Sequence, residues 1–249
     1  MKIIKQSWSF LNDFDDFDID KILSRIEETG RTAYKTEEKI TDESYEKFIR
    51  GLVKSGHFSV LEHGSLSIRI ITNRAIANEI VRHRLVSYTQ ESTRYCNYSN
   101  EKFGNEITVI LPSWFYSLEP IEETIKTIDD LPERRNPAGR FLSNLEKQFE
   151  RWIWAIRQTE YTYYDLLKLG QHPEQARGIL PLDLKTELVM TANLTEWRHI
   201  LKLRTAKDVH PQCRELFLSI LQEFYNKLPI VFEDILIGKV VIQELEKAL

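Results

Sequence analysis

The sequence has only two cysteines in 249 residues, Cys96 and Cys213, and they form no CxxC pair. This scarcity excludes a disulfide framework and a zinc ribbon, and it is typical of proteins in a reducing compartment. No apolar run approaches the ~18–20 residues of a membrane span. The opening MKIIKQSWSFLNDFDDFDID turns acidic after ten residues, unlike a secretory signal peptide. We therefore expect a cytoplasmic protein without a membrane segment.

The chain also lacks a net positive charge, because its 38 acidic residues outnumber its 34 lysines and arginines and give a formal net charge of −4. Proteins that coat nucleic acids are usually basic, so the charge argues against a general nucleic-acid partner. It leaves open a local basic site for a small anion. The remaining composition, 42% hydrophobic and 29% charged residues, is that of an ordinary globular protein.

Apolar periodicity predicts more helices than strands. Helices are expected at 18–30 with Gly30 as the stop, at 41–56 closed by Gly56, and from Asn73 to about Arg84 with Thr72 or Asn73 as the cap. Further helices are expected at 141–169, at 193–204 with a capping-box-like start at Asn193 and Glu196, and, as the final helix, at 211–228. Strands are expected at 65–72, 106–115 and 187–193, and the proline-broken segment 121–140 is interpreted as a surface excursion. The strands are too scattered for regular βαβ winding. We predict a single α+β domain over residues 1–249, with an antiparallel sheet packed against several long helices.

One segment, RHRLVSYTQESTRYCNYS at 82–99, concentrates cations and hydroxyl groups in this acidic chain. The basic residues Arg82, His83 and Arg84 would suit the negative end of a helix, and that explanation suffices for RHR alone. The hydroxyl and amide groups from Ser87 to Arg94 add the composition of a phosphate-binding loop. The glycines of a Walker loop or a GxGxxG loop are absent.

The spacing RHR-x7-S, from Arg82 to Ser92, resembles the motif of the flavin-dependent thymidylate synthases, the ThyX family. Two more segments resemble that family in the same order: SGHFSVLEHGSLSIRI at 55–70 and PEQARGILPLDLKTELVMTANLTEWRHILKLR at 173–204. The similarity extends from about Ile22 to Phe232. Agreement of several segments in order is far more specific than one short pattern.

The resemblance implies methylation of dUMP to dTMP by a homotetramer with active sites shared between subunits. Methylenetetrahydrofolate would supply the carbon, FAD would mediate, and NADPH would be the reductant. No metal is implied, and no nucleic acid or membrane partner. The residues implied to bind FAD are Ser59, Arg82, His83, Arg84, Gln90, Asn193, Leu194, Thr195 and His199. Those implied to bind dUMP are Glu79, Ile80, Val81, Arg82, Gln90, Glu91, Ser92, Thr93, Arg94, Arg177 and Arg204.

Arg204 is the implied catalytic residue. A guanidinium beside the pyrimidine N3 favours the anionic ring and makes C5 more nucleophilic, so no protein nucleophile is needed. The chain departs from the family at Glu79, where many members have Gln, and at Gln90, which is often Glu. The two exchanges are expected to compensate. His199 also stands where some members have Asn.

Two other classes of function fit parts of the sequence. Arg82, Arg84 and Arg94 with nearby tyrosines could form an RNA-binding module, which would bind nucleic acid in a salt-sensitive way and carry no chromophore. A helical interaction protein with a structural ion-pair cluster would bind neither cofactor nor nucleotide. A metal site that combines His57, Glu62 and His63 with His83 is disfavoured, because the spacing is no HExxH.

Overall fold

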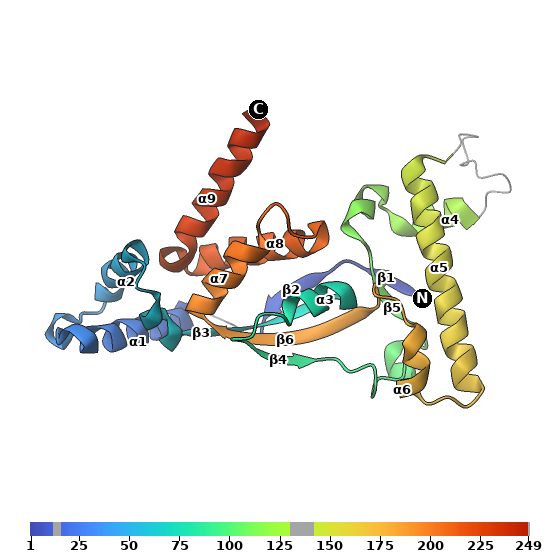
Figure 1. The fold of residues 1–249 in the computed structure, drawn as a ribbon, viewed down its shortest axis with the longest axis horizontal. Helices are drawn as coiled ribbons and strands as arrows, with labels where there is room; N and C mark the ends of the chain where they lie inside the picture. Colours follow the sequence, from blue (N-terminus) through green and yellow to red (C-terminus); the bar gives the residue numbers. More distant parts are fainter. Residues whose placement is uncertain (12–15, 130–141, 249) are drawn as a thin grey trace. The chain divides into compact units, whose positions relative to one another are not determined.

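The computed structural model describes residues 1–11, 16–129 and 142–248. Two compact units are present (Figure 1). The first unit contains Met1–Gln6, Ile71–Ala77 and Gln90–Glu187, and the second contains Ser7–Ile70, Asn78–Thr89 and Leu188–Leu249. Each unit is assembled from separated stretches of the chain. The prediction of a single domain over residues 1–249 stays a prediction.

The main sheet has four strands in the order β2-β3-β6-β4 and is antiparallel, which confirms the predicted α+β class. Its strands are β2 (Ser7–Phe10), β3 (Ser65–Asn73), β4 (Ser87–Gln90) and β6 (Lys185–Asn193). β3 and β6 alternate buried and less buried side chains over nine residues each, the pattern of a sheet with one face on the core. The short helix α3 (Arg74–Ile80) directly follows β3.

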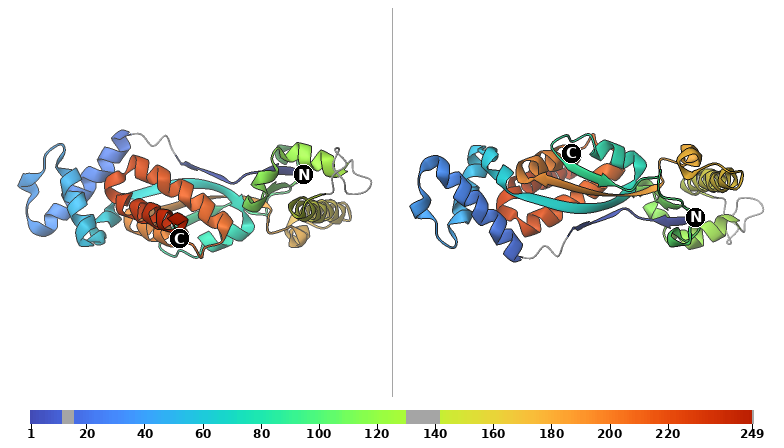
Figure 2. Two further views of the ribbon diagram at one scale, coloured as in Figure 1. Left: turned by 90° about the horizontal axis from the view of Figure 1, so that it is seen from above. Right: turned by 90° about the horizontal axis from the view of Figure 1, so that it is seen from below.

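Helices α7 and α8 lie over one face of this sheet in the second unit, and α9 packs on helices α2, α7 and α8 (Figures 1 and 2). The second unit contains α1 (Asp16–Tyr34), η1 (Glu37–Lys39), α2 (Ser44–Ser55), η2 (Phe58–His63), α7 (Leu194–Arg204), α8 (Pro211–Lys227) and α9 (Pro229–Ala248). Trp197 of α7 is fully buried and donates a hydrogen bond to the Leu66 carbonyl of β3 at 3.1 Å, so the helix layer is fixed to the sheet.

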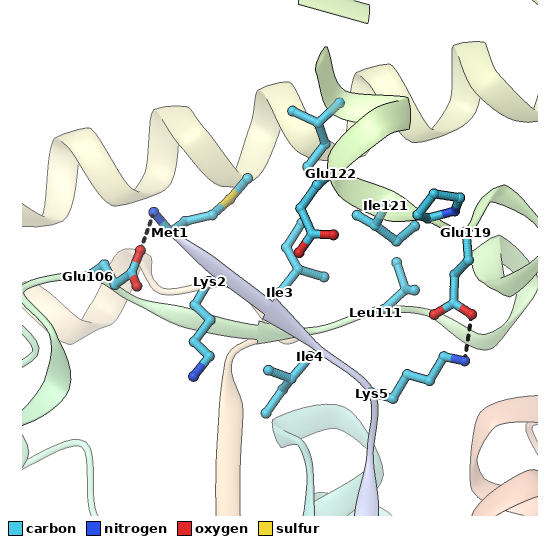
Figure 3. Close-up of a pocket in the computed structure, with 12 residues that line it drawn as sticks. Met1, Lys2, Ile3, Ile4, Lys5, Glu106, Leu111, Glu119, Ile121 and Glu122 are labelled. Atoms are coloured by element: carbon cyan, nitrogen blue, oxygen red, sulfur yellow. Dashed lines mark hydrogen bonds and ion pairs between the residues drawn. The ribbon is translucent and has the colours of Figure 1, made fainter. Parts of the chain in front are cut away.

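The first unit is centred on the long helix α5 (Asn144–Lys168), which begins with a capping box between Ser143 and Glu146. The unit also contains β1 (Lys2–Ile4), η3 (Glu101–Phe103), β5 (Thr108–Ile110), η4 (Ser113–Leu118), α4 (Ile121–Asp129), α6 (Pro173–Ala176) and η5 (Arg177–Ile179). β1 pairs with β5 in parallel. Beside β1 lies a hollow of about 920 Å³ (Figure 3).

Several sequence predictions about elements were wrong. Gly30 does not stop the first helix, since α1 continues to Tyr34. A Cβ at Gly30 would lie 2.6 Å from the Phe48 ring, so this glycine permits close packing of α2 on α1.

The strand expected at 106–115 is shorter than predicted, because β5 ends at Ile110 and Ser113–Leu118 forms the 3-10 helix η4. The segment interpreted as a surface excursion contains α4 up to Asp129, and residues 130–141 lie outside the described ranges. The helix at 211–228 is not the last, because α9 follows it.

A further correction concerns the RHR segment. α3 ends at Ile80, so Arg82, His83 and Arg84 lie in the turn after the helix and not in its last turn. The cap was predicted correctly, since the Asn73 Oδ1 accepts a hydrogen bond from the Ile76 amide at 2.8 Å. No helix in the described ranges is long and apolar enough to cross a membrane.

Candidate active site

Arg204 is placed by helix α7, which has a defined start and end. The side chain of Asn193 caps the helix by accepting a hydrogen bond from the Glu196 amide at 2.8 Å, as predicted. The helix ends at Arg204, whose side chain is only 13% exposed. A charge buried to this degree requires partners that satisfy its donors.

Glu79 and His83 supply those partners. The Arg204 Nε donates to the His83 Nε2 at 3.0 Å, and its Nη1 donates to the Glu79 carboxylate at 3.0 Å. Its Nη2 donates to the Glu79 backbone carbonyl at 2.5 Å. Three of the five guanidinium N–H groups are thereby engaged, and the guanidinium also interacts with the buried Cys213 thiol. We call Glu79, His83, Glu196, His199 and Arg204 the Arg204 cluster; all five lie in the second unit.

His83 is a neutral acceptor in this cluster. Burial lowers the pKa of His83 to about 4, and the charges of Arg204 and His199 act in the same direction. Its Nε2 faces a permanently protonated donor, so the imidazole proton belongs on Nδ1. The Nδ1 lies 3.7 Å from the Glu196 carboxylate, which is itself buried. Sequence reasoning missed Glu196, because the Asn193-x-x-Glu196 spacing indicated only a helix cap.

The turn that holds His83 is fixed by Tyr88 of β4. Its hydroxyl donates to the Ile80 carbonyl at 2.7 Å and lies 3.2 Å from the His83 carbonyl. His83 is thereby kept buried while Arg82 and Arg84 stay exposed on either side of it. Neither of these two guanidinium groups has a partner among the described residues. Two free arginines beside a buried histidine form a donor set that suits the diphosphate of a flavin nucleotide.

The other residues expected at the flavin have diverse surroundings. Ser59 and His199 are exposed, and His199 meets the His83 ring edge-on with the ring centroids 6.0 Å apart. The Thr195 hydroxyl donates to the Phe58 carbonyl at 2.5 Å. Leu194 is fully buried, and its amide donates a hydrogen bond to the Gly64 carbonyl at 2.9 Å. Of the residues expected at dUMP in this unit, Ile80 is likewise buried and Val81 is 39% exposed.

A second group of predicted residues gathers in the first unit. We call residues 90–94 the Ser92 loop, and the structure brings Arg177 to it from η5. The Arg177 Nη1 donates to the buried Thr93 hydroxyl at 3.1 Å, which joins residues 84 positions apart. The Ser92 hydroxyl accepts from the Arg94 amide at 3.3 Å. Gln90 donates to the Thr186 hydroxyl at 3.1 Å.

The Glu91 carboxylate already accepts hydrogen bonds from two side chains. One oxygen accepts from the Lys185 ammonium at 2.8 Å, and the other accepts from the Tyr98 hydroxyl at 3.1 Å. Its amide donates to the Glu187 carbonyl at 2.8 Å. These contacts anchor the start of the Ser92 loop on β6, and the Glu91 carbonyl accepts a hydrogen bond from the Arg74 Nη1 at 3.5 Å.

Arg94 is exposed and carries a competing anion. Its Nε donates to the Glu174 carboxylate at 3.0 Å, with both side chains at least half exposed. Glu174 also accepts from the Arg177 Nε through its backbone carbonyl at 3.2 Å. Sequence reasoning missed Glu174. Its only signal was its place three residues before Arg177 in the PEQAR segment.

Neither cysteine provides a nucleophile. Burial raises the pKa of the Cys213 thiol to about 12, and burial also raises the pKa of Cys96. The three groups His83, Glu196 and His199 have ligand atoms within 4.8 Å of one another, which is compatible with a metal ion. However, the His83 Nε2 already accepts a hydrogen bond from the Arg204 guanidinium, and the positive charge of that guanidinium disfavours a cation beside it. The absence of a metal stays a prediction.

Comparison with known proteins decides the family. The family model described as thymidylate synthase complementing protein matches residues 19–230, most of the chain. The chain belongs to this family. The ThyX resemblance of the sequence is confirmed, and the family is that of the flavin-dependent thymidylate synthases.

Curated members of the family have similar sequences. A flavin-dependent thymidylate synthase from Pyrococcus furiosus is 29% identical over 199 residues, which cover 80% of this chain and 70% of the relative. The protein of the same name from Pyrococcus abyssi is 30% identical and covers 76% and 66%. That from Mycobacterium avium is 28% identical and covers 84% and 78%. This chain therefore spans between two thirds and four fifths of the length of these ThyX relatives.

Proposed function

We propose that this chain methylates dUMP to dTMP, with methylenetetrahydrofolate as carbon donor, FAD as the flavin and NADPH as the reductant. Flavin-dependent thymidylate synthesis is the activity that family membership supports. The choice of FAD, of NADPH and of the folate is part of the proposal. So are the homotetramer with shared active sites and the cytoplasmic location.

One observation carries the proposal: the Arg204 guanidinium is held in position by a neutral histidine and a carboxylate. A guanidinium directed at the pyrimidine N3 stabilises the negative charge that develops when C5 attacks. His83 must be neutral to accept the Nε hydrogen bond, and its lowered pKa keeps it so at neutral pH. We propose Arg204 as the catalytic residue, with Glu79 and His83 as its positioning residues.

The flavin would be held by this chain's free donors. Arg82 and Arg84 are proposed to bind its diphosphate, with Ser59, His83, Thr195 and His199 around it and the backbone of Asn193 and Leu194 beside it. When bound, the flavin supplies the hydride chemistry that no side chain provides. A protein nucleophile is not required, and both thiols are held protonated by burial.

The nucleotide phosphate is proposed to bind at the Ser92 loop. Ser92, Thr93 and Arg94 offer hydroxyl and guanidinium donors, and Arg177 adds a second guanidinium. Gln90 and Glu91 are proposed to line this phosphate site. The family resemblance also assigns Glu79, Ile80, Val81 and Arg82 of the second unit to nucleotide binding. The mutual compensation of Glu79 and Gln90 stays a prediction.

A visible spectrum of the purified protein tests this function. We expect a flavin band after addition of FAD, and a shift of that band when dUMP is added, because both ligands would share one site. Measurement of dTMP formation with and without NADPH then tests the reaction. A protein that takes up no FAD and gives no response to dUMP would contradict the proposal and favour the RNA-binding alternative.

A further inference from the structure

A hollow of about 630 Å³ lies between helices α1 and α2 of the second unit. Its lining contains three basic side chains and two aromatic rings. The basic residues are Arg31, Lys39 and Lys47, and the rings belong to Tyr34 and Phe48. No carboxylate is among the described residues that line it. In a chain with a net charge of −4, a hollow lined by cations without acids is an unusual environment.

The two lysines are unpaired, whereas the arginine is fixed. Lys39 and Lys47 are exposed, and their ammonium groups have no ion pair or hydrogen bond with any residue in the described ranges. Arg31 donates from Nε and Nη2 to the buried Glu27 at 2.8 and 2.6 Å, and it stacks over the Phe48 ring at 4.8 Å. Glu27 thus fixes Arg31, which in turn packs on Phe48 at one side of the hollow. The ammonium groups of Lys39 and Lys47 remain free to bind an anion.

The large hollow beside β1 provides a contrast. Two of its three cations are paired with acids that line the same hollow: Lys5 pairs with Glu119 at 2.8 Å, and the Met1 ammonium pairs with Glu106 at 3.0 Å (Figure 3). An anion entering there would have to displace carboxylates. The α1–α2 hollow presents no such competitor, so charge distinguishes the two hollows.

Gly51 is a second, independent indication. It lies within α2 and lines the hollow, although glycine in a helix interior is less favourable than alanine by roughly 1 kcal/mol. Packing does not require it, because a Cβ there would meet nothing within 4 Å. Positive φ does not require it either, in contrast to Gly56 at φ 72°. The absence of a side chain at Gly51 leaves the hollow open on the side of α2.

We propose that the α1–α2 hollow binds a polyanion that carries an aromatic ring, with the anionic groups on Lys39 and Lys47 and the ring against Phe48 and Tyr34. This inference rests on the proposed function, because that reaction consumes two co-substrates of this chemistry. NADPH combines phosphates with adenine, and reduced folate combines carboxylates with an aminobenzoyl ring. The sequence assigned neither of them any residue.

Titration of the full-length protein with NADP⁺ and, separately, with tetrahydrofolate tests the proposal by calorimetry. For the ligand that uses this hollow, Lys39→Gln combined with Lys47→Gln is expected to weaken binding by roughly tenfold or more, because two charge-assisted contacts are lost. Higher salt should weaken wild-type binding and have less effect on the double variant. The matched control, Lys54→Gln combined with Lys168→Gln, changes the same net charge outside the hollow and should bind as wild type does.

Gly51 gives a test that does not depend on charge. Gly51→Ala should raise the melting temperature, since it improves helix propensity without a clash, and Gly51→Leu should fill the hollow and abolish binding of the same ligand. An effect limited to NADP⁺ identifies the reductant as occupant, and an effect limited to tetrahydrofolate identifies the carbon donor. If both lysine and leucine variants bind both probes as wild type does, the inference is wrong.

The flavin spectrum separates this inference from the proposed function. Wild type and the lysine and leucine variants should all show the flavin band and its shift on dUMP addition, because none of these residues belongs to the Arg204 cluster or the Ser92 loop. A dUMP response with unchanged co-substrate binding in every variant overturns only the α1–α2 site. Loss of the dUMP response in wild type overturns the proposed function itself.

Discussion

The Arg204 cluster and the Ser92 loop use arginine in opposite ways. Arg204 is 13% exposed and satisfied by three hydrogen bonds to two partners, one of them a neutral histidine. Arg94 is 58% exposed and held by a single carboxylate that is itself half exposed. The first arginine is oriented before a ligand arrives, and the second can exchange its partner for a ligand.

This contrast follows from the energetics of the two environments. A solvent-exposed ion pair contributes only ~0–1 kcal/mol, so a dianionic phosphate can replace Glu174 at Arg94 at little expense. A buried guanidinium cannot lose a partner so cheaply, because the remaining group would be buried without compensation. Exposure therefore suits Arg94 for binding, and burial suits Arg204 for catalysis, where fixed geometry matters most.

The largest effect is expected from removing the buried arginine, Arg204. Arg204→Ala should fold and keep flavin while lowering kcat by roughly 10²–10³-fold, the usual effect of removing a donor to developing negative charge. Arg94→Ala should instead raise KM for dUMP and leave kcat much closer to wild type. Steady-state kinetics with flavin content as a check on folding distinguish the two. Near wild-type turnover of Arg204→Ala would contradict the catalytic role of Arg204.

The next effect concerns the acid sensitivity of the buried cluster. His83 has a folded pKa of about 4, below its ordinary value of 6.5, so the unfolded chain binds more protons between these pH values. The stability that the neutral form provides is present above pH 6.5 and is lost as pH falls toward 4, by roughly 3 kcal/mol at most. Thermal unfolding followed across this range should show the slope. His83→Gln keeps an acceptor for Arg204 but should flatten the slope, and an unchanged slope would refute the assignment.

Glu79 separates position from charge within the cluster. Glu79→Ala removes an anchor of Arg204 and should lower kcat/KM by roughly tenfold, because a misplaced guanidinium stabilises charge poorly. Glu79→Gln keeps an acceptor oxygen for Nη1 and should stay within about threefold of wild type. Equal damage in both variants, measured as kcat/KM for dUMP, would show that the negative charge itself is needed.

The smallest effect would sharpen the exposed side of the contrast. Glu174→Gln should lower KM for dUMP by about two- to threefold, since it releases Arg94 from a weak exposed ion pair. The effect should shrink in higher salt, which already screens the pair. Glu101→Gln serves as a control for the loss of one negative charge, because Glu101 lies on η3 and has no ion pair among the described residues. An unchanged KM for Glu174→Gln alone would mean that Glu174 does not compete with the nucleotide.

Local sequence patterns predicted those elements whose signals are themselves local. Gly56 closes α2 at φ 72°, and Asn193 caps α7, because a positive φ and an amide cap are set by neighbouring residues. The prediction for Gly30 was wrong, since the position requires glycine because the ring of Phe48 packs against it from another helix. The end of α3 was placed too late for a similar reason: Tyr88 of β4 binds the Ile80 carbonyl and holds the turn that follows.

By itself, the sequence determined the α+β class, the family and the candidate residues, because periodicity, caps and ordered motifs are written along the chain. Only the tertiary structure decided which of those residues act together. It joined Arg204 to Glu79 and His83, 125 and 121 positions away, and Arg177 to Thr93. It also turned Glu196 toward His83 and bound Glu91 to Lys185. Hydrogen-bond partners and burial set the charge state and direction of a side chain, and both depend on residues distant in sequence.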